Sequence, residues 1–240
     1  GFLEKSPYIA ATLIHMYAKC GVLLKAEQVL EEMHDRDVVC WNALIAGYAQ
    51  HGQGREALIS FEHMKCEGYS PNIVTFIFIL KACGIVKAID KGKEIHEKVD
   101  SIGLLSKDVA LGNALIDMYV KRGFLAKAHQ TLCKLQIRNV VSWTSLISGY
   151  VKCEHAEKAL NLFDQMRYDG ISPNELTFSC ALKACGNIQL VRKGEEIHAE
   201  IQGSLENDVL LGTSLVDMYA KCGFLEKARE VFETLKSRDV

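Results

Sequence analysis

The 240-residue chain lacks any uninterrupted apolar run of about 18 residues, the length that a membrane-spanning helix needs, so we expect no membrane partner. It also lacks an excess of positive charge, because 28 lysines and arginines stand against 30 aspartates and glutamates, a formal net charge of −2. Phosphate binding normally requires a basic surface, so this balance argues against a nucleic-acid partner. No segment alternates apolar and polar residues for long enough to indicate a β-sheet.

Catalytic and metal-binding patterns are absent as well. His198 and Glu200 imitate the H-x-E motif of zinc deaminases, but no P-C-x-x-C motif follows, and the repeat equivalent His96 is followed by Glu97 and Lys98. We find no arrangement of nucleophile, base and orienting residue, and no glycine-rich phosphate loop. We therefore predict no catalytic site, no metal and no cofactor, and we interpret His96 and His198 as packing residues.

The nine cysteines are odd in number, and their positions follow an internal repeat. Cys20, Cys153 and Cys222 share one repeat position, and Cys83 and Cys185 share another. A disulfide framework would need even pairing in an oxidising compartment. We predict instead that these cysteines are small buried packing residues in a reducing compartment.

The chain repeats itself with a long period. VVCWNALIAGYAQ at 38–50 returns as VVSWTSLISGYVK at 140–152, a shift of 102 residues. LKACG at 80–84 returns at 182–186 with the same shift. Self-similarity at a fixed period indicates stacked units that share one continuous core, rather than one compact globule.

Each long block divides into three helix-turn-helix units on one apolar frame. Trp41, Leu44, Ile45 and Tyr48 have the i, i+3, i+4, i+7 spacing of a helix, and Gly52 interrupts it. The fold class predicted from this pattern is an all-α solenoid of helix-turn-helix repeats, and we expect the chain to be a segment of a longer array. The predicted units are 7–37, 38–72, 73–108, 109–139, 140–174, 175–208 and 209–239, with 1–6 ending a preceding repeat and residue 240 starting a further one.

A row of lysines recurs just before the turn of several units, at Lys19, Lys121, Lys152 and Lys221. Lysines at this place can solvate the end of a helix and complement its dipole. They can equally form a spaced row of phosphate contacts. The sequence leaves both interpretations open.

The unit VVSWTSLISGYVKCEHAEKALNLFDQMRYDGISPN at 140–174 resembles the pentatricopeptide repeat. The order of short, standard and variable units, with DMYAKCG and LKACG elements, is similar to the plant subclass that alternates P, L and S repeats. The resemblance covers essentially the whole chain and implies a right-handed superhelical solenoid. The S repeats would be 7–37, 109–139 and 209–239, the P repeats 38–72 and 140–174, and the L repeats 73–108 and 175–208.

The resemblance implies that the partner is single-stranded RNA, held in extended form with one base per readable repeat. Members of this subclass commonly specify sites of C-to-U RNA editing in chloroplasts or mitochondria, which adds editing-complex proteins as partners. Any deaminase activity would lie outside these residues or in a partner, so this chain would not itself be an enzyme. The alternative is a helical-repeat scaffold for protein–protein interaction, which the slightly acidic balance favours.

In this family the fifth and last residues of a repeat contact the Watson–Crick edge of one base, and an apolar second residue wedges between bases. The implied base-selecting pairs are Asn42 with Asn72, Asn113 with Asn139, Thr144 with Asn174, Ser179 with Asp208, and Thr213 with Asp239. The implied wedge residues are Val39, Ala110, Val141 and Leu210, and the implied phosphate contacts are Lys19, Lys121, Lys152 and Lys221.

Hydrogen-bond chemistry supports a role for the last position. An aspartate only accepts, which suits the N–H groups of guanine and uracil, whereas an asparagine can donate to the ring nitrogens of adenine and cytosine. In the family, threonine or serine at the fifth position goes with a purine and asparagine with a pyrimidine. The expected RNA is 5′-Y-N-Y-A-(G)-G-3′ for the units from 38–72 to 209–239. These residue types are also common at helix starts and turns, but their recurrence in frame favours the RNA interpretation.

Overall fold

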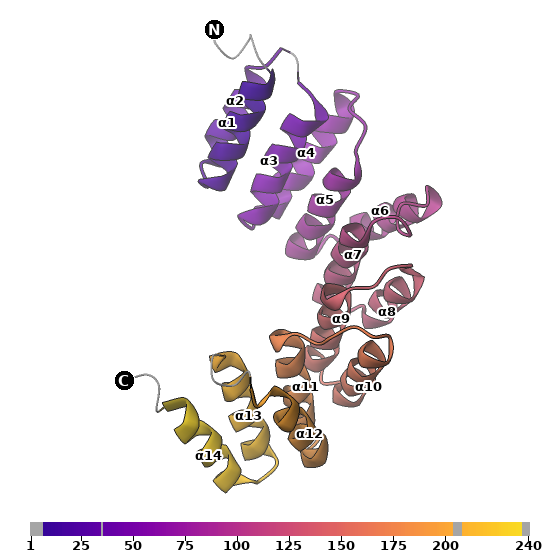
Figure 1. Ribbon diagram of the computed structural model, residues 1–240. Coiled ribbons are helices and arrows are strands. Elements are labelled where there is room, and N and C mark those ends of the chain that lie inside the picture. The colour runs from indigo at the N-terminus through magenta and orange to yellow at the C-terminus, as the bar shows by residue number, and fades with distance from the viewer. Residues whose placement is uncertain (1–6, 35, 204–207, 237–240) are drawn as a thin grey trace. The chain divides into compact units, whose positions relative to one another are not determined.

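The computed structural model describes residues 7–34, 36–203 and 208–236. These residues form fourteen α-helices and no strand (Figure 1), which confirms the all-α prediction. The helices are α1 Pro7–Lys19, α2 Leu23–Glu31, α3 Val38–Gln50, α4 Gly54–Cys66, α5 Ile73–Val86, α6 Ile89–Ser101, α7 Val109–Lys121, α8 Leu125–Lys134, α9 Val140–Lys152, α10 Ala156–Tyr168, α11 Glu175–Asn187, α12 Val191–Ile201, α13 Val209–Lys221 and α14 Leu225–Lys236. None of them is long and apolar enough to cross a membrane.

Consecutive helices form helix-turn-helix pairs, from α1 with α2 to α13 with α14. The first helix of each pair begins where a predicted unit begins, at residues 7, 38, 73, 109, 140, 175 and 209. The division of the units into P, L and S classes stays a prediction. The fragments predicted at 1–6 and 240 lie outside the described residues.

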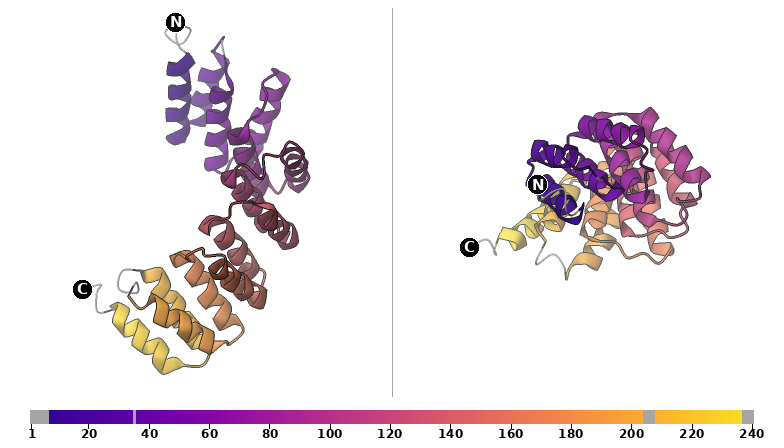
Figure 2. Two further views of the ribbon diagram at one scale, coloured as in Figure 1. Left: turned by 45° about the vertical axis from the view of Figure 1, so that its right-hand side comes forward. Right: turned by 90° about the horizontal axis from the view of Figure 1, so that it is seen from above.

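The chain divides into two compact units, Gly1–Gln136 and Ile137–Val240. In the first unit α1, α3, α5 and α7 pack in order, each first helix against the next (Figures 1 and 2). Trp41 and Ile45 of α3 are 4% and 0% exposed, so the helical stripe seen in the sequence forms the core. Gly47 allows α3 to approach α1 closely, because a Cβ atom there would lie 2.6 Å from the Cβ of Ala18.

In the second unit α9, α11 and α13 pack in order (Figure 2). The core of the second unit uses the same residue types at the same repeat positions as the first unit. Those positions hold Trp41, Leu44, Ile45 and Tyr48 in the first unit and Trp143, Leu146, Ile147 and Tyr150 in the second, and all eight side chains are buried. Ion pairs recur with the same period: Arg138 with Asp169 repeats Arg36 with Glu67, and Lys193 with Asp164 repeats Lys91 with Glu62. Both the core and the surface contacts therefore follow the long period of the sequence.

The cysteine prediction holds at one repeat position and is wrong at the other. Cys83 and Cys185 are fully buried, and loss of hydration raises the pKa of their thiols to about 11 and about 12. Cys20 and Cys153 are exposed and Cys222 is half-exposed. These three residues follow the last turn of a first helix, at its C-terminal end, so they do not face the neighbouring helix.

Candidate nucleic-acid interface

In each unit from 7–37 to 175–208, the predicted last residue caps the first helix that follows it. The side chains of Asn72, Asn139 and Asn174 accept a hydrogen bond from the backbone N–H of the third helical residue, at 3.1, 3.0 and 2.9 Å. Asp108 and Asp208 cap α7 and α13 in the same way, at 2.8 and 3.2 Å. Such caps satisfy backbone donors that have no partner inside the helix. The capping role thus holds these side chains at the start of the first helices.

The predicted pair Asn42 and Asn72 is in direct contact. Nδ2 of Asn42 donates to Oδ1 of Asn72 at 3.1 Å. The hydroxyl of Thr75, the third residue of α5, donates to Oδ1 of Asn42 at 2.6 Å and lies 3.1 Å from Oδ1 of Asn72. Asn42 and Thr75 are buried, so these bonds form away from bulk water. Two residues that are 30 positions apart in the chain therefore act as one hydrogen-bonded group.

The predicted pair Thr144 and Asn174 is joined through a third residue. The hydroxyls of Thr144 and Thr177 lie 2.6 Å apart, and the Thr177 hydroxyl donates to Oδ1 of Asn174 at 2.7 Å. Each hydroxyl has one hydrogen, so Thr144 donates to Thr177, and Thr177 donates to Asn174. The chain of bonds leaves Thr144 with acceptor lone pairs only.

These contacts fix the orientation of the two N-cap amides. A backbone N–H can only donate, so the atom that faces it in Asn72 and Asn174 must be Oδ1. The Nδ2 atoms lie on the other side of the amide groups and have no hydrogen-bond acceptor within the described part of the chain. Each N-cap amide therefore presents a donor and keeps its acceptor for the helix.

Of the other predicted pairs, Ser179 and Asp208 bond to different partners. The hydroxyl of Ser179 bonds to that of Ser214 at 2.7 Å, while Asp208 caps α13. Thr213 is exposed and donates to carbonyl groups of its own helix. Asp239 lies outside the described residues. Asn113 is half-exposed on α7, and Asn139 forms a capping box with Ser142.

The four predicted wedge residues are the second residues of first helices, and all are exposed. Val39 is 61% exposed, and the side chains of Ala110, Val141 and Leu210 are exposed as well. Val74 and Leu176 occupy the same helical position and are also exposed, although the sequence reasoning did not name them. An apolar second residue in every unit was the signal that would have found them.

The four predicted phosphate-contacting lysines are exposed at the C-terminal ends of the first helices. In a 13-residue helix this is about 20 Å from the N-cap. Lys121 and Lys221 each form an ion pair with the aspartate four residues earlier, Asp117 and Asp217, at 2.7 Å. Pairs between exposed side chains contribute roughly 0–1 kcal/mol, so a phosphate could replace either aspartate as partner.

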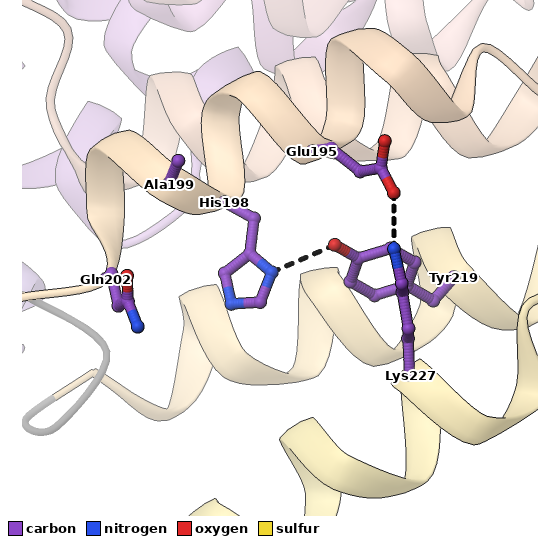
Figure 3. A pocket seen from close by; sticks show the side chains of 6 residues that line it. All are labelled: Glu195, His198, Ala199, Gln202, Tyr219 and Lys227. Atoms are coloured by element: carbon purple, nitrogen blue, oxygen red, sulfur yellow. Dashed lines mark hydrogen bonds and ion pairs between the residues drawn. The ribbon is translucent and has the colours of Figure 1, made fainter.

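A pocket between α12, α13 and α14 is unrelated to this interface (Figure 3). Nδ1 of His198 lies 2.9 Å from the hydroxyl of Tyr219, and Lys227 pairs with Glu195. Burial lowers the pKa of His198, because loss of hydration disfavours the charged ring. His96 and Tyr119 form the same contact in the first unit, as expected for packing residues.

Sequence comparison identifies the repeat. The model of the PPR repeat family matches residues 36–84 and 138–187, and the model of a single PPR repeat matches 11–38, 113–140 and 213–240. The chain belongs to the pentatricopeptide repeat (PPR) family. Two PPR relatives from Arabidopsis thaliana, one named as chloroplastic and one as mitochondrial, are 37% and 36% identical over 99% of the chain. The chain spans 39% and 43% of their lengths.

The fold agrees with that of solved PPR proteins. The crystal structure of the PPR protein PPR10 in complex with an 18-nt psaJ RNA element matches 99% of this chain and 36% of its own, with a TM-score of 0.79. The sequence identity is 19%, so this likeness concerns the fold. Within the described residues, no group of three or more His, Cys, Asp or Glu side chains is placed to hold a metal ion.

Proposed function

We propose that this chain binds single-stranded RNA, with one base at each readable repeat. The observation that supports this most strongly is the joining of a fifth helical residue to the next N-cap, in Asn42 with Asn72 and in Thr144 with Asn174. Exposed apolar residues at the second helical position, such as Val39, supply surface against which bases can stack.

The pair of Thr144 and Asn174 favours adenine. Asn174 offers the donor Nδ2, and Thr144 offers only acceptor lone pairs. The Watson–Crick edge of adenine has the complementary groups, since its N1 accepts and its N6 amino group donates. Guanine would place its N1–H against the Nδ2 donor, which leaves both groups without a partner.

The pair of Asn42 and Asn72 favours cytosine among the pyrimidines. Oδ1 of Asn42 accepts from the Thr75 hydroxyl, and Oδ1 of Asn72 accepts from the Thr75 N–H and from Nδ2 of Asn42, so the remaining hydrogen-bonding groups of the two amides are N–H donors. Cytosine has an acceptor at N3, whereas uracil has a donor there. The geometry therefore supports a narrower choice than the pyrimidine that the sequence alone predicted.

We further propose that the chain is the RNA-recognition segment of an RNA-editing specificity factor of the PLS subclass, acting in a chloroplast or mitochondrion. The order of short, standard and variable units supports the subclass. The relatives named as chloroplastic and mitochondrial support the organelle. The chain would supply the address, and editing-complex proteins or other parts of the protein would supply the chemistry.

A gel-shift comparison of single-stranded and duplex RNA tests RNA binding. Duplex formation hides the Watson–Crick edges that the selecting residues need, so we expect clear preference for the single strand. Comparable binding to both forms would contradict the proposal. A folded chain that binds no RNA would favour the second candidate, a protein-binding scaffold, which the net charge of −2 and the paired Lys121 and Lys221 support.

A further inference from the structure

The residue type at the third position of the first helices follows the identity of the N-cap. The structure describes the N-caps of six first helices, of which three are asparagine and three are aspartate. Three positions after each asparagine N-cap stands a hydroxyl residue: Thr75 after Asn72, Ser142 after Asn139 and Thr177 after Asn174. Three positions after each aspartate N-cap stands a residue without a hydroxyl: Cys40 after Asp37, Leu111 after Asp108 and Leu211 after Asp208. A side-chain hydroxyl therefore accompanies each amide cap and none of the carboxylate caps.

The difference between an amide and a carboxylate explains this pattern. The two oxygens of an aspartate are equivalent, so one can cap the helix while the other still accepts a hydrogen bond. The two ends of an asparagine amide differ, so the direction in which it points decides whether it presents a donor or an acceptor. A hydroxyl that donates to Oδ1 stabilises one of these two directions.

We propose that Thr75, Ser142 and Thr177 are positioning residues for base selection, which rests on the RNA-binding function proposed above. The hydroxyls of Ser142 and Thr177 donate to Oδ1 of the N-cap amides of Asn139 and Asn174, at 3.0 and 2.7 Å. The Thr75 hydroxyl donates to Oδ1 of Asn42, and Nδ2 of Asn42 in turn donates to Oδ1 of Asn72 at 3.1 Å. In Asn72 and Asn174, Nδ2 is then the group left for the base. All three positioning residues are completely buried, so they act on the base through the asparagine without touching it.

Thr75 and Thr177 also contact the fifth residue of the preceding repeat. Thr75 donates to Oδ1 of Asn42, and Thr177 bonds to the hydroxyl of Thr144 at 2.6 Å. One buried hydroxyl thus sets the hydrogen-bonding state of both selecting side chains. Selectivity at a repeat then depends on a residue in the next repeat, three positions beyond the N-cap.

The test compares Thr177→Val with Thr177→Ser in the full chain, using single-stranded RNAs that carry adenine or guanine at the base opposite repeat 140–174. That base is identified as the position at which Asn174→Asp changes preference. Thr177→Val keeps the shape but removes the hydroxyl, so we expect the adenine-to-guanine affinity ratio to fall about fivefold or more. Thr177→Ser retains the hydroxyl and should keep the adenine-to-guanine affinity ratio, since Ser142 supplies a serine hydroxyl at the equivalent position. Unchanged selectivity in folded Thr177→Val would overturn the proposal.

Two controls separate positioning from stability. Thr131→Val removes another completely buried hydroxyl, on α8, and should leave the ratio unchanged. In the Asn174→Asp background, Thr177→Val should have little effect on the ratio, because a carboxylate needs no orientation. If that background were equally sensitive, the hydroxyl would be acting on stability alone, and the proposal would be wrong.

The outcomes also distinguish this inference from the function on which it rests. A wild-type chain with no preference between adenine and guanine at any position would refute base selection itself. A wild-type chain that discriminates, with Thr177→Val discriminating equally, would refute only the positioning role. If Thr177→Val does not fold, Thr75→Val provides the same comparison with cytosine and uracil.

Discussion

Replacing Asn174 by aspartate exchanges the group that faces the base while preserving the helix cap. One carboxylate oxygen can keep both contacts of Oδ1, the Thr177 N–H at 2.9 Å and the Thr177 hydroxyl at 2.7 Å. The other oxygen takes the place of Nδ2, so an acceptor replaces a donor. Asparagine and aspartate are nearly equal as N-caps, so the free energy of unfolding should change by less than about 0.5 kcal/mol.

The effect on RNA should be larger and limited to one base. The variant loses the donor that matches adenine N1 and gains an acceptor that matches guanine N1–H. A hydrogen-bond readout of this kind is worth about 1–3 kcal/mol, so we expect the preference to move from adenine toward guanine by about 5- to 150-fold. Fluorescence anisotropy with two RNAs that differ at that base measures the change.

A charge-matched control is available in the same repeat. Asn161→Asp adds the same negative charge on the exposed surface of α10, and should weaken binding to both RNAs equally if it has any effect. An Asn174→Asp variant whose adenine-to-guanine ratio equals that of the wild type would show that Thr144 and Asn174 do not select a base.

Three further predictions follow from the geometry. Changing Lys121 and Lys152 together to alanine should weaken binding to all RNA sequences alike and lower the salt dependence, with a slope reduced by about 1–2; an altered base preference would refute phosphate contact. Gly47→Val should reduce the free energy of unfolding by about 1–3 kcal/mol in chemical denaturation, because its Cβ would lie 2.6 Å from a side-chain carbon of α1. Burial lowers the pKa of His96 and His198, so the unfolded chain binds more protons below about pH 6.5. Stability should therefore fall as pH drops from about 6.5 toward the folded pKa values, and replacing both histidines by glutamine should reduce that slope in denaturation at pH 7 and pH 5.

The helices were predictable because the apolar spacing repeats in several copies of one pattern. Trp41 and Trp143 occupy equivalent core positions, and Gly52 has the positive φ of 77° that the break after α3 requires. The N-cap role of Asn174 was weighed as an alternative to base selection, and the structure shows that one side chain can do the first while its Nδ2 stays available for the second.

Three features escaped the sequence reasoning for different reasons. The Asn-x-x-Thr pattern of Asn72 and Thr75 signalled a capping box, but its bond to Asn42 depends on packing between helices 33 residues apart. The ion pair of Lys121 with Asp117 has the i, i+4 spacing of a helical pair, but that spacing alone does not distinguish an ion pair from a lysine that contacts phosphate. The exposure of Cys153 could not be predicted from its repetition, because turn positions repeat as faithfully as core positions.

Selection from a pool of random single-stranded RNA tests the central claim most directly. The bound RNA should be enriched in 5′-Y-N-Y-A-(G)-G-3′, with cytosine as the first pyrimidine and adenine three nucleotides after it. The same adenine should become guanine when the selection is repeated with Asn174→Asp. Enrichment that shows no base preference at this position, or that is unchanged in the variant, would contradict the assignment of one base to each readable repeat.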